Sequence, residues 1–119
     1  MPREFKRSDR VAEVIQREIG MLLVNGVKDP RLGMVTITGA KVSDDLKHAN
    51  VYFSVHGDEA RQQEALRGLT SAAGFFRSRL RSVTELRYIP DLHFRYDVSM
   101  DEGERIDRLL REVKEREQK

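Results

Sequence analysis

Between Ala49 and His56 the side chains alternate strictly between apolar and polar, and this alternation restricts the fold more than any other feature. One side of an extended strand would carry Ala49, Val51, Phe53 and Val55, and the other would carry Asn50, Tyr52, Ser54 and His56. A shorter alternation begins at Val35, where Val35 and Ile37 alternate with threonines. Strands with a single apolar face predict a sheet that is covered on one side only.

Helical spacing precedes and follows these two strands. Apolar residues recur at that spacing from Val11 to Leu23, which predicts a helix over 9–24 with Ser8 as its N-cap. After Asp58 a second apolar stripe runs through Leu66, Leu69, Ala72 and Ala73, and a stripe of different phase follows through Phe75, Phe76, Leu80 and Val83. We interpret this as two helices that meet at Gly74; one continuous helix that tolerates Gly74 is the alternative.

The end of the chain adds a third strand and a further helix. Leu92, Phe94 and Tyr96 alternate with polar residues, and the spacing of Ser99 and Glu102 is that of a capping box. We therefore expect one α+β domain, with the order α-β-β-α-kink-α-β and a three-stranded sheet covered by helices on one face. This domain spans residues 1–98, and a C-terminal helical extension spans 99–119, with an end that frays.

Composition excludes several classes of protein. With 119 residues there is room for one domain, and without cysteine there is neither a disulfide nor a thiolate metal site. His48, His56 and His93 lack the spacing of metal ligands on a helix, so no metal or other cofactor is expected. No apolar run approaches the ~20 residues that cross a membrane, and none follows the charged N-terminus as in a signal peptide, so we expect a cytoplasmic protein with no membrane partner.

Motifs of catalysis are equally scarce. The sequence has neither a phosphate loop nor a GxGxxG pattern, and its tight carboxylate pair, Asp44 and Asp45, is explained more simply by a turn. We therefore expect no enzyme and no small-molecule substrate, with an RNA hydrolase of unfamiliar active site as the alternative.

Positive charge is concentrated in two places, although the net charge is only +2. The first ten residues contain Arg3, Lys6, Arg7 and Arg10, and the segment 75–89 contains Arg77, Arg79, Arg81 and Arg87 against Glu85 alone. Clusters of this kind predict contact with an anionic polymer. The alternative is a solvated basic face with no partner.

Short segments distributed along most of the chain resemble the ribosome-binding factor A family in their order and spacing. They are Asp29-Pro30-Arg31-Leu32, Val35-Thr36-Ile37-Thr38, Val42-Ser43-Asp44-Asp45-Leu46, Ala49-Asn50-Val51-Tyr52-Phe53, Ala72-Ala73-Gly74-Phe75-Phe76-Arg77, Ile89-Pro90-Asp91-Leu92 and Arg105-Ile106-Asp107-Arg108-Leu109-Leu110. The resemblance implies a type II KH fold in which Ala72-Ala73-Gly74 is a kink that replaces the Gly-x-x-Gly loop of ordinary KH domains. This sequence contains no Gly-x-x-Gly.

The resemblance also implies a function. Members of the family bind free, immature 30S ribosomal subunits through 16S rRNA and assist late maturation, including 16S rRNA 5′-end processing, with the greatest need in the cold. We accordingly expect a monomer that acts without catalysis. A general KH-like RNA-binding module without ribosome specificity is one alternative, and an adaptor that docks a protein through the stripe from Ile106 to Val113 is another.

The candidate RNA-binding residues lie around the kink. They are Ala73, Gly74, Arg77 and Arg81, joined by Arg3, Lys6, Arg7 and Arg10 if the first helix packs nearby. Gly74 would let a ligand approach the backbone, and a helix that starts there would offer free N–H groups to a phosphate. Guanidinium groups suit phosphate oxygens, although Arg77 and Arg81 would alternatively only solvate a core helix. Tyr52 is expected to be an ordinary cross-strand residue beside Thr36 or Arg95; stacking on a base is the alternative.

Overall fold

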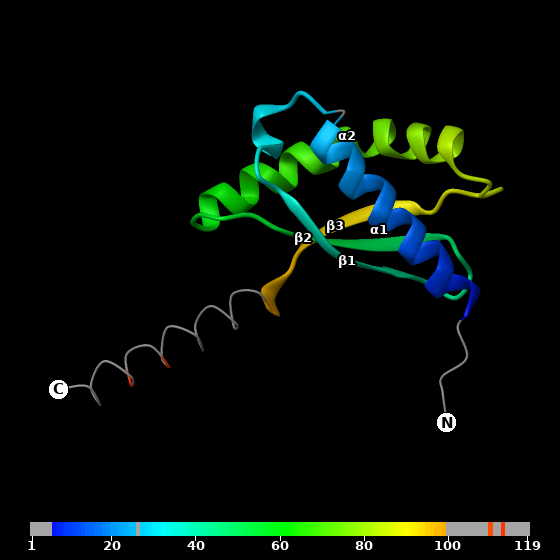
Figure 1. Ribbon diagram of the computed structural model, residues 1–119, viewed down its shortest axis with the longest axis horizontal. Coiled ribbons are helices and arrows are strands. Elements are labelled where there is room, and N and C mark those ends of the chain that lie inside the picture. The colour runs from blue at the N-terminus through cyan, green and yellow to red at the C-terminus, as the bar shows by residue number, and fades with distance from the viewer. Residues whose placement is uncertain (1–5, 26, 100–109, 111–112, 114–119) are drawn as a thin grey trace.

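The structure is a computed structural model that describes residues 6–25 and 27–99 together with Leu110 and Val113. Its elements, in order, are α1 (Arg7–Asn25), a short 3-10 helix η1 (Pro30–Leu32), β1 (Thr36–Val42), β2 (His48–Ser54), α2 (Glu59–Val83) and β3 (Asp91–Tyr96). The sheet has the order β1-β2-β3, with β1 antiparallel and β3 parallel to the central β2. Both helices lie on one side of this sheet (Figure 1), which confirms the predicted α+β fold.

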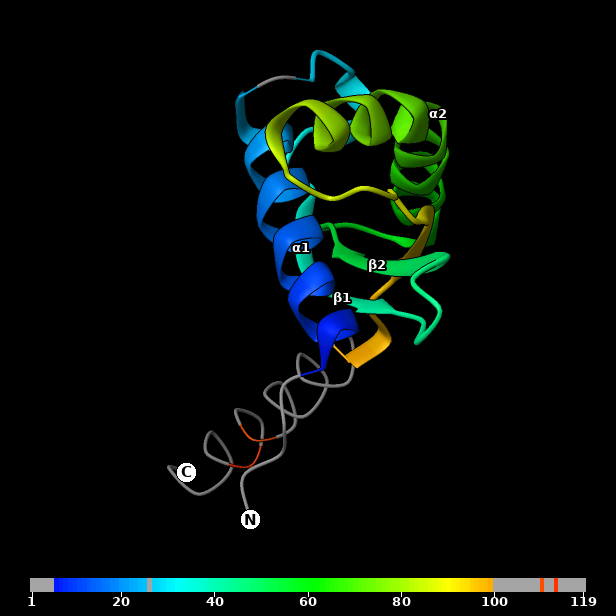
Figure 2. The same cartoon turned by 90° about the vertical axis from the view of Figure 1, so that its right-hand side faces the viewer.

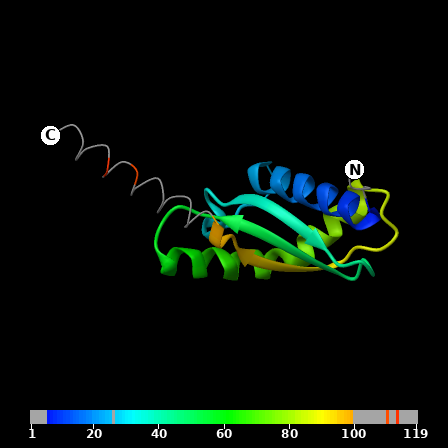
Figure 3. The same cartoon turned by 90° about the horizontal axis from the view of Figure 1, so that it is seen from below.

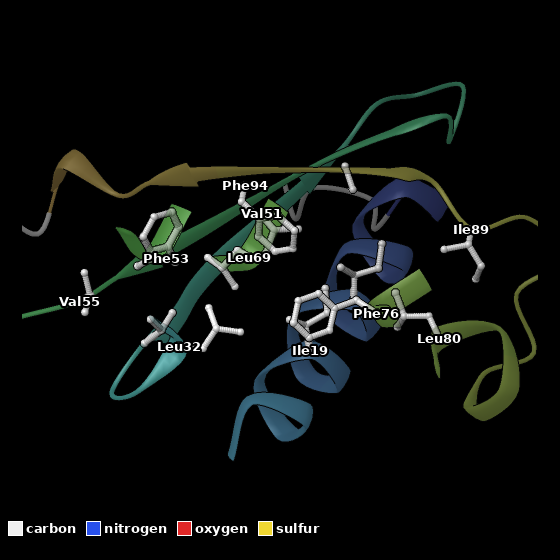
Figure 4. Close-up of a cluster of buried hydrophobic side chains, with 14 of the residues drawn as sticks. Ile19, Leu32, Val51, Phe53, Val55, Leu69, Phe76, Leu80, Ile89 and Phe94 are labelled. Carbon is white, nitrogen blue, oxygen red and sulfur yellow. The ribbon is translucent and has the colours of Figure 1, made fainter. Parts of the chain in front are cut away.

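The core fills the space between the helices and the inner face of the sheet (Figure 4). Its fully buried side chains include Ile15 and Ile19 of α1, Val51 and Phe53 of β2, and Leu69, Phe76 and Leu80 of α2. The alternation in β2 is realised as predicted, because Ala49, Val51 and Phe53 are buried while the residues between them are partly exposed. α1 begins at Arg7, so Ser8 is a buried residue of the first turn and not the N-cap.

α2 is one helix where two were predicted. It starts after Asp58, whose side chain accepts a hydrogen bond from the backbone N–H of Arg61 at 3.0 Å, and it continues through Gly74 to Val83. Gly74 has no positive φ, so its backbone stays compatible with the helix. A glycine inside a helix costs about 1 kcal/mol but does not interrupt the hydrogen bonds. The helix is nevertheless bent, and its second half runs in a different direction from its first (Figures 2 and 3).

The connection between α1 and β1 is fastened to α2. Gly68 is buried beneath η1, and a Cβ on Gly68 would lie 2.9 Å from Leu32 Cδ2. The guanidinium of Arg61 donates hydrogen bonds to the carbonyl oxygens of Arg31, at 2.8 Å, and Gly33, at 2.6 Å. These contacts hold η1 against the first half of α2.

The outer face of the sheet has no helix over it in the described part of the chain; Figure 3 views the molecule from that side. A bulge between Ile37 and Gly39 places Gly39 opposite Tyr52. The predicted extension 99–119 lies outside the described residues, apart from Ser99, Leu110 and Val113. No helix within the described ranges is long and apolar enough to cross a membrane.

Candidate nucleic-acid interface

The outward side of α2 carries small and basic residues along one line. Arg67, Ser71, Gly74, Ser78 and Arg81 follow one another at helical spacing, and all are exposed; we call them the α2 stripe. Residues three or four apart are neighbours on a helix surface. The middle of the stripe therefore consists of small residues, and an arginine lies towards each end.

Gly74 is the lowest point of the α2 stripe. A Cβ placed on Gly74 would have no atom of a described residue within 4 Å, once its chain neighbours and nearby helix backbone are set aside. Packing within the described part of the chain therefore does not require glycine at this position, in contrast to Gly68. A missing Cβ does allow another molecule's backbone to approach closely.

The continuity of α2 corrects one part of the predicted site. A helix that started at Gly74 would offer free N–H groups to a phosphate, but α2 runs from Glu59 to Val83 without interruption. In a continuous helix the N–H groups after Gly74 are bonded to carbonyl oxygens of the preceding turn. Ala73 is half-buried and packs against the core. The surface around Gly74 is thus available to a ligand through its shape and not through an exposed helix end.

The two arginines predicted to act as a pair are separated by their surroundings. Arg77 donates a hydrogen bond from Nη2 to the carbonyl oxygen of Ile89 at 3.1 Å, and the same nitrogen lies 3.6 Å from Asp91 Oδ1. Its Nε is buried without a hydrogen-bond partner among the described residues. Arg81, by contrast, is exposed and forms no ion pair with any residue in the described ranges. Arg77 is thus engaged within the protein, whereas Arg81 is open to solvent; binding of RNA by either residue stays a prediction.

The N-terminal basic residues lie on a different surface. Arg3 is outside the described residues, whereas Lys6, Arg7 and Arg10 are exposed at the start of α1. Lys6 lines a cleft of about 330 Å³ together with Lys41 of β1. The end of α2 lies instead beside Val14 and Arg17, further along α1, and Figure 2 shows the start of α1 well away from the second half of α2. The structure thus brings Lys6 to the sheet and not to Arg81.

Two basic residues of these surfaces were missed from the sequence. Arg67 is seven residues before Gly74, so it joins the stripe only if the helix continues through Gly74. Lys41 faces the same side as Asn50, which becomes visible only with the register of β1 on β2. The signal for Arg67 was therefore present in the sequence, whereas the position of Lys41 depends on strand pairing.

The polar side chains of the described residues do not form a cluster of metal ligands. His48 Nδ1 and His93 Nε2 lie 3.2 Å apart across β2 and β3, a contact between side chains 45 residues apart. No group of three or more potential metal ligands is found among the residues that the structure describes. The exposed basic residues are therefore the candidate site in this part of the chain.

Known proteins similar to this chain come from one family. A family model described as ribosome-binding factor A matches residues 7–110. The ribosome-binding factor A of Trichlorobacter lovleyi is 53% identical over 110 residues, covering 92% of this chain and 89% of its own, and that of Geobacter metallireducens is 50% identical over 109 residues, covering 92% of each.

Solved structures agree with this similarity. The solution structure of a Thermotoga maritima protein, a putative ribosome binding factor A, has a TM-score of 0.69 and 28% identity, covering 80% of this chain and 91% of that one. A homology model of the Thermus thermophilus factor, as fitted into a cryo-EM map of its complex with the 30S subunit, has a TM-score of 0.60 and 25% identity, covering 71% and 89%.

Proposed function

The chain belongs to the ribosome-binding factor A family, and from this premise we propose that it binds free, immature 30S ribosomal subunits through 16S rRNA. There it assists the late maturation of the subunit, including processing of the 5′ end of 16S rRNA, without catalysing a reaction. The Thermus relative fitted into a 30S complex supports the choice of subunit.

The observation that carries the proposal is the α2 stripe. Gly74 lies open between Ser71 and Ser78, and exposed arginines stand towards both ends. A sugar-phosphate backbone can lie across the small residues while the guanidinium groups of Arg67 and Arg81 bind phosphate oxygens. Ala73 supports this surface from the core side, and Arg77 positions it through its bond to Ile89.

The mode of RNA contact differs from that of an ordinary KH domain. A Gly-x-x-Gly loop clamps the backbone of four nucleotides, and this sequence has none. The KH-like domain, residues 1–98, would instead recognise the backbone and shape of folded rRNA through its bent helix. Lys6, Arg7 and Arg10, with Arg3 before them, add a second basic group at the start of α1.

Binding without turnover is sufficient for such a factor. A ligand shifts a conformational equilibrium only by the difference between its affinities for the two states. A factor that binds one conformation of immature rRNA more tightly therefore favours that conformation. Because mispaired rRNA helices persist longer at low temperature, this assistance matters most in the cold. The factor acts in the cytoplasm as a monomer.

Sedimentation with purified ribosomal particles tests the proposal. We expect the protein to comigrate with free 30S subunits and not with 50S subunits or 70S ribosomes. Equal affinity for subunits and for short single-stranded RNA would indicate a general KH-like module without ribosome specificity. Failure to comigrate with any particle containing 16S rRNA would refute the proposal.

The α2 stripe is tested with two double variants of equal charge. Arg67→Ala with Arg81→Ala removes both arginines of the stripe, whereas Arg79→Ala with Arg87→Ala removes two exposed arginines outside it. Each phosphate contact contributes roughly 0.7 to 0.9 to the slope of log K against log salt. We expect the first variant to bind 30S subunits more weakly and with a shallower slope than the second. Equal effects of the two variants would exclude the stripe as the contact.

A further inference from the structure

The outer face of the sheet presents a second set of cations around a tyrosine. The strand register places Gly39, Tyr52 and Arg95 in one row across the three strands, and Lys41, Asn50 and His93 in the next row. We call these residues the sheet platform. The helices lie on the other side of the sheet (Figures 1 and 3), so the platform is separate from the α2 stripe.

The basic side chains of the platform lack ion-pair partners among the described residues, whereas acids near it accept hydrogen bonds within the protein. Lys41 and Arg95 are exposed and have no ion-pair partner among the described residues. The Nε of Arg95 donates a hydrogen bond to Asn50 Oδ1 at 3.0 Å, which holds the guanidinium across β2. The nearby Asp97 accepts hydrogen bonds from Thr38 Oγ1 at 2.6 Å and from Ser99 Oγ at 2.5 Å.

Three acids around the platform, Asp97, Asp91 and Asp45, are bonded within the protein, and Asp44 is an exposed acid that lines a cleft with Lys41. Asp91 lies 3.6 Å from Arg77 Nη2, and Asp45 accepts hydrogen bonds from Ser43 and from the N–H of Lys47. The cationic groups that remain suit an anionic ligand.

Tyr52 has open space beside its ring. Its partner on β3 is Arg95, as expected, but its partner on β1 is Gly39 and not Thr36, which lies opposite Ser54. A Cβ on Gly39 would have no atom of a described residue within 4 Å beyond its chain neighbours. The result is a hollow of about 300 Å³ lined by Gly39, Ala40, Lys41, Tyr52 and Asp97. No aromatic ring of the described residues stacks on Tyr52.

We propose that the sheet platform is a second RNA contact that takes one unpaired nucleotide, with the base stacked on Tyr52 in the hollow beside Gly39 and the flanking phosphates bound by Lys41 and Arg95. Bases stack on aromatic side chains without regard to sequence. Lys41 and Arg95 lie one row and two strands apart on the platform, which is roughly 12 Å between their backbone positions, and their long side chains can reach towards Tyr52 from both sides to meet the two phosphates of one nucleotide. The identity of this RNA as 16S rRNA rests on the proposed function; the binding chemistry does not.

RNA suits this face better than a protein partner does. The centres of protein interfaces are rich in apolar side chains and poor in charge. Tyr52 is the only large aromatic side chain of the platform, and its other side chains are basic, amide or imidazole groups. An isolated aromatic ring bordered by cations is the arrangement found in proteins that bind single-stranded nucleic acid.

A structural role for Tyr52 is the competing explanation, because an aromatic ring can simply cover the glycine opposite it. Three tyrosine variants separate the two roles. Tyr52→Phe keeps the ring, Tyr52→Val removes it but keeps a side chain suited to a strand, and Tyr88→Val removes a tyrosine that is 54% exposed in the loop before β3. Circular dichroism and thermal unfolding establish that each variant is folded.

The probe is a short oligouridylate with a fluorescent label, and its binding is followed through the anisotropy of the label, so that the signal does not depend on the tyrosines that the variants remove. We expect Tyr52→Val to weaken binding about tenfold, and Tyr52→Phe and Tyr88→Val to change it less than about twofold. Lys41→Ala should reduce the salt slope by roughly 0.7. If Tyr52→Val does not fold, the salt slopes of oligonucleotide binding by Lys41→Ala and Arg95→Ala test the platform instead.

Sedimentation of the same variants with 30S subunits keeps the two proposals apart. Wild-type binding to the oligonucleotide but not to subunits would refute the proposed function and leave the platform standing. Unchanged oligonucleotide binding by Tyr52→Val and Lys41→Ala would overturn the platform, whatever the subunits show. Absence of wild-type oligonucleotide binding would also overturn it, and loss of subunit binding by the variants in that case would assign the face to a protein of the subunit.

Discussion

Arg77 Nη2 donates a hydrogen bond to the carbonyl oxygen of Ile89 at 3.1 Å and thereby joins the second half of α2 to the segment that enters β3. Ile89 and Pro90 are both buried. The guanidinium thus satisfies a backbone acceptor at the point where the chain returns from the helical layer to the sheet. The sequence predicted that Arg77 binds the ligand, and in the structure its side chain holds β3 in position.

Loss of the Arg77 guanidinium should therefore destabilise the fold. Hydrogen bonds that involve a charged group contribute about 1.5–3 kcal/mol, so we expect Arg77→Ala to lower the free energy of unfolding in urea by about that amount. Arg79→Ala, an exposed neighbour on the same helix, should change it by less than about 0.5 kcal/mol. Equal effects of the two substitutions would show that the bond to Ile89 contributes nothing.

Gly68 and Gly74 should respond in opposite ways to the same substitution. In Gly68→Ala the new Cβ would meet Leu32 Cδ2 at 2.9 Å, and overpacking of this kind costs about 1–3 kcal/mol. In Gly74→Ala nothing is met within 4 Å, so the helix should gain about 0.5–1 kcal/mol. Urea unfolding of both variants is the measurement.

Gly74→Ala should also weaken binding to 30S subunits although it strengthens the fold. The added methyl group occupies the lowest point of the α2 stripe, where the proposed RNA backbone approaches closely. Sedimentation of the variant with 30S subunits gives the answer. A more stable protein with unchanged affinity would show that the RNA does not touch Gly74.

Truncation of the core side chains of α2 should unfold much of the domain. Phe76 and Leu80 are both 0% exposed, and substitution of such residues by alanine costs about 3–5 kcal/mol for phenylalanine and 2–5 kcal/mol for leucine. Differential scanning calorimetry should show a large fall in Tm for each variant. Phe75→Ala is the matched control, because Phe75 is 43% exposed.

Asp97 should link stability to pH in the acid range. Hydrogen bonds from Ser99 and Thr38 hold the pKa of Asp97 below its ordinary value. Its contribution to stability is therefore complete above the unfolded pKa of about 3.9 and is lost as the pH falls through the lower pKa of the folded protein. Ser99→Ala and Thr38→Val should each raise the pKa of Asp97 in an NMR titration. An unchanged pKa in both variants would contradict this assignment.

Hydrophobic pattern predicted the elements of the fold because burial of one face is a local property of a strand or helix. The alternation around Val51 and the burial of Phe76 and Leu80 followed from spacing alone. The predicted helix break at Gly74 was wrong, since the small propensity cost of one glycine is outweighed by the packing of the residues on both sides.

The candidate site was less accessible to prediction because it depends on contacts between distant segments. The bond between Arg77 and Ile89 joins residues 12 apart across a loop, and the placement of Lys41 beside Asn50 depends on a register that a bulge shifts. Neither leaves a periodic trace in the sequence. Ala73 and Gly74 were predicted at a junction of two helices and lie instead inside the continuous helix α2.

The parallel pairing of β3 with β2 has a consequence for how the chain assembles. β1 and β2 are connected by a short turn and can pair as soon as both have been synthesised, whereas β3 reaches β2 only after α2 has folded back across the sheet. A nascent chain that ends within α2 therefore carries an open backbone edge along β2, which is a template for wrong partners. Arrival of the last strand seals that edge.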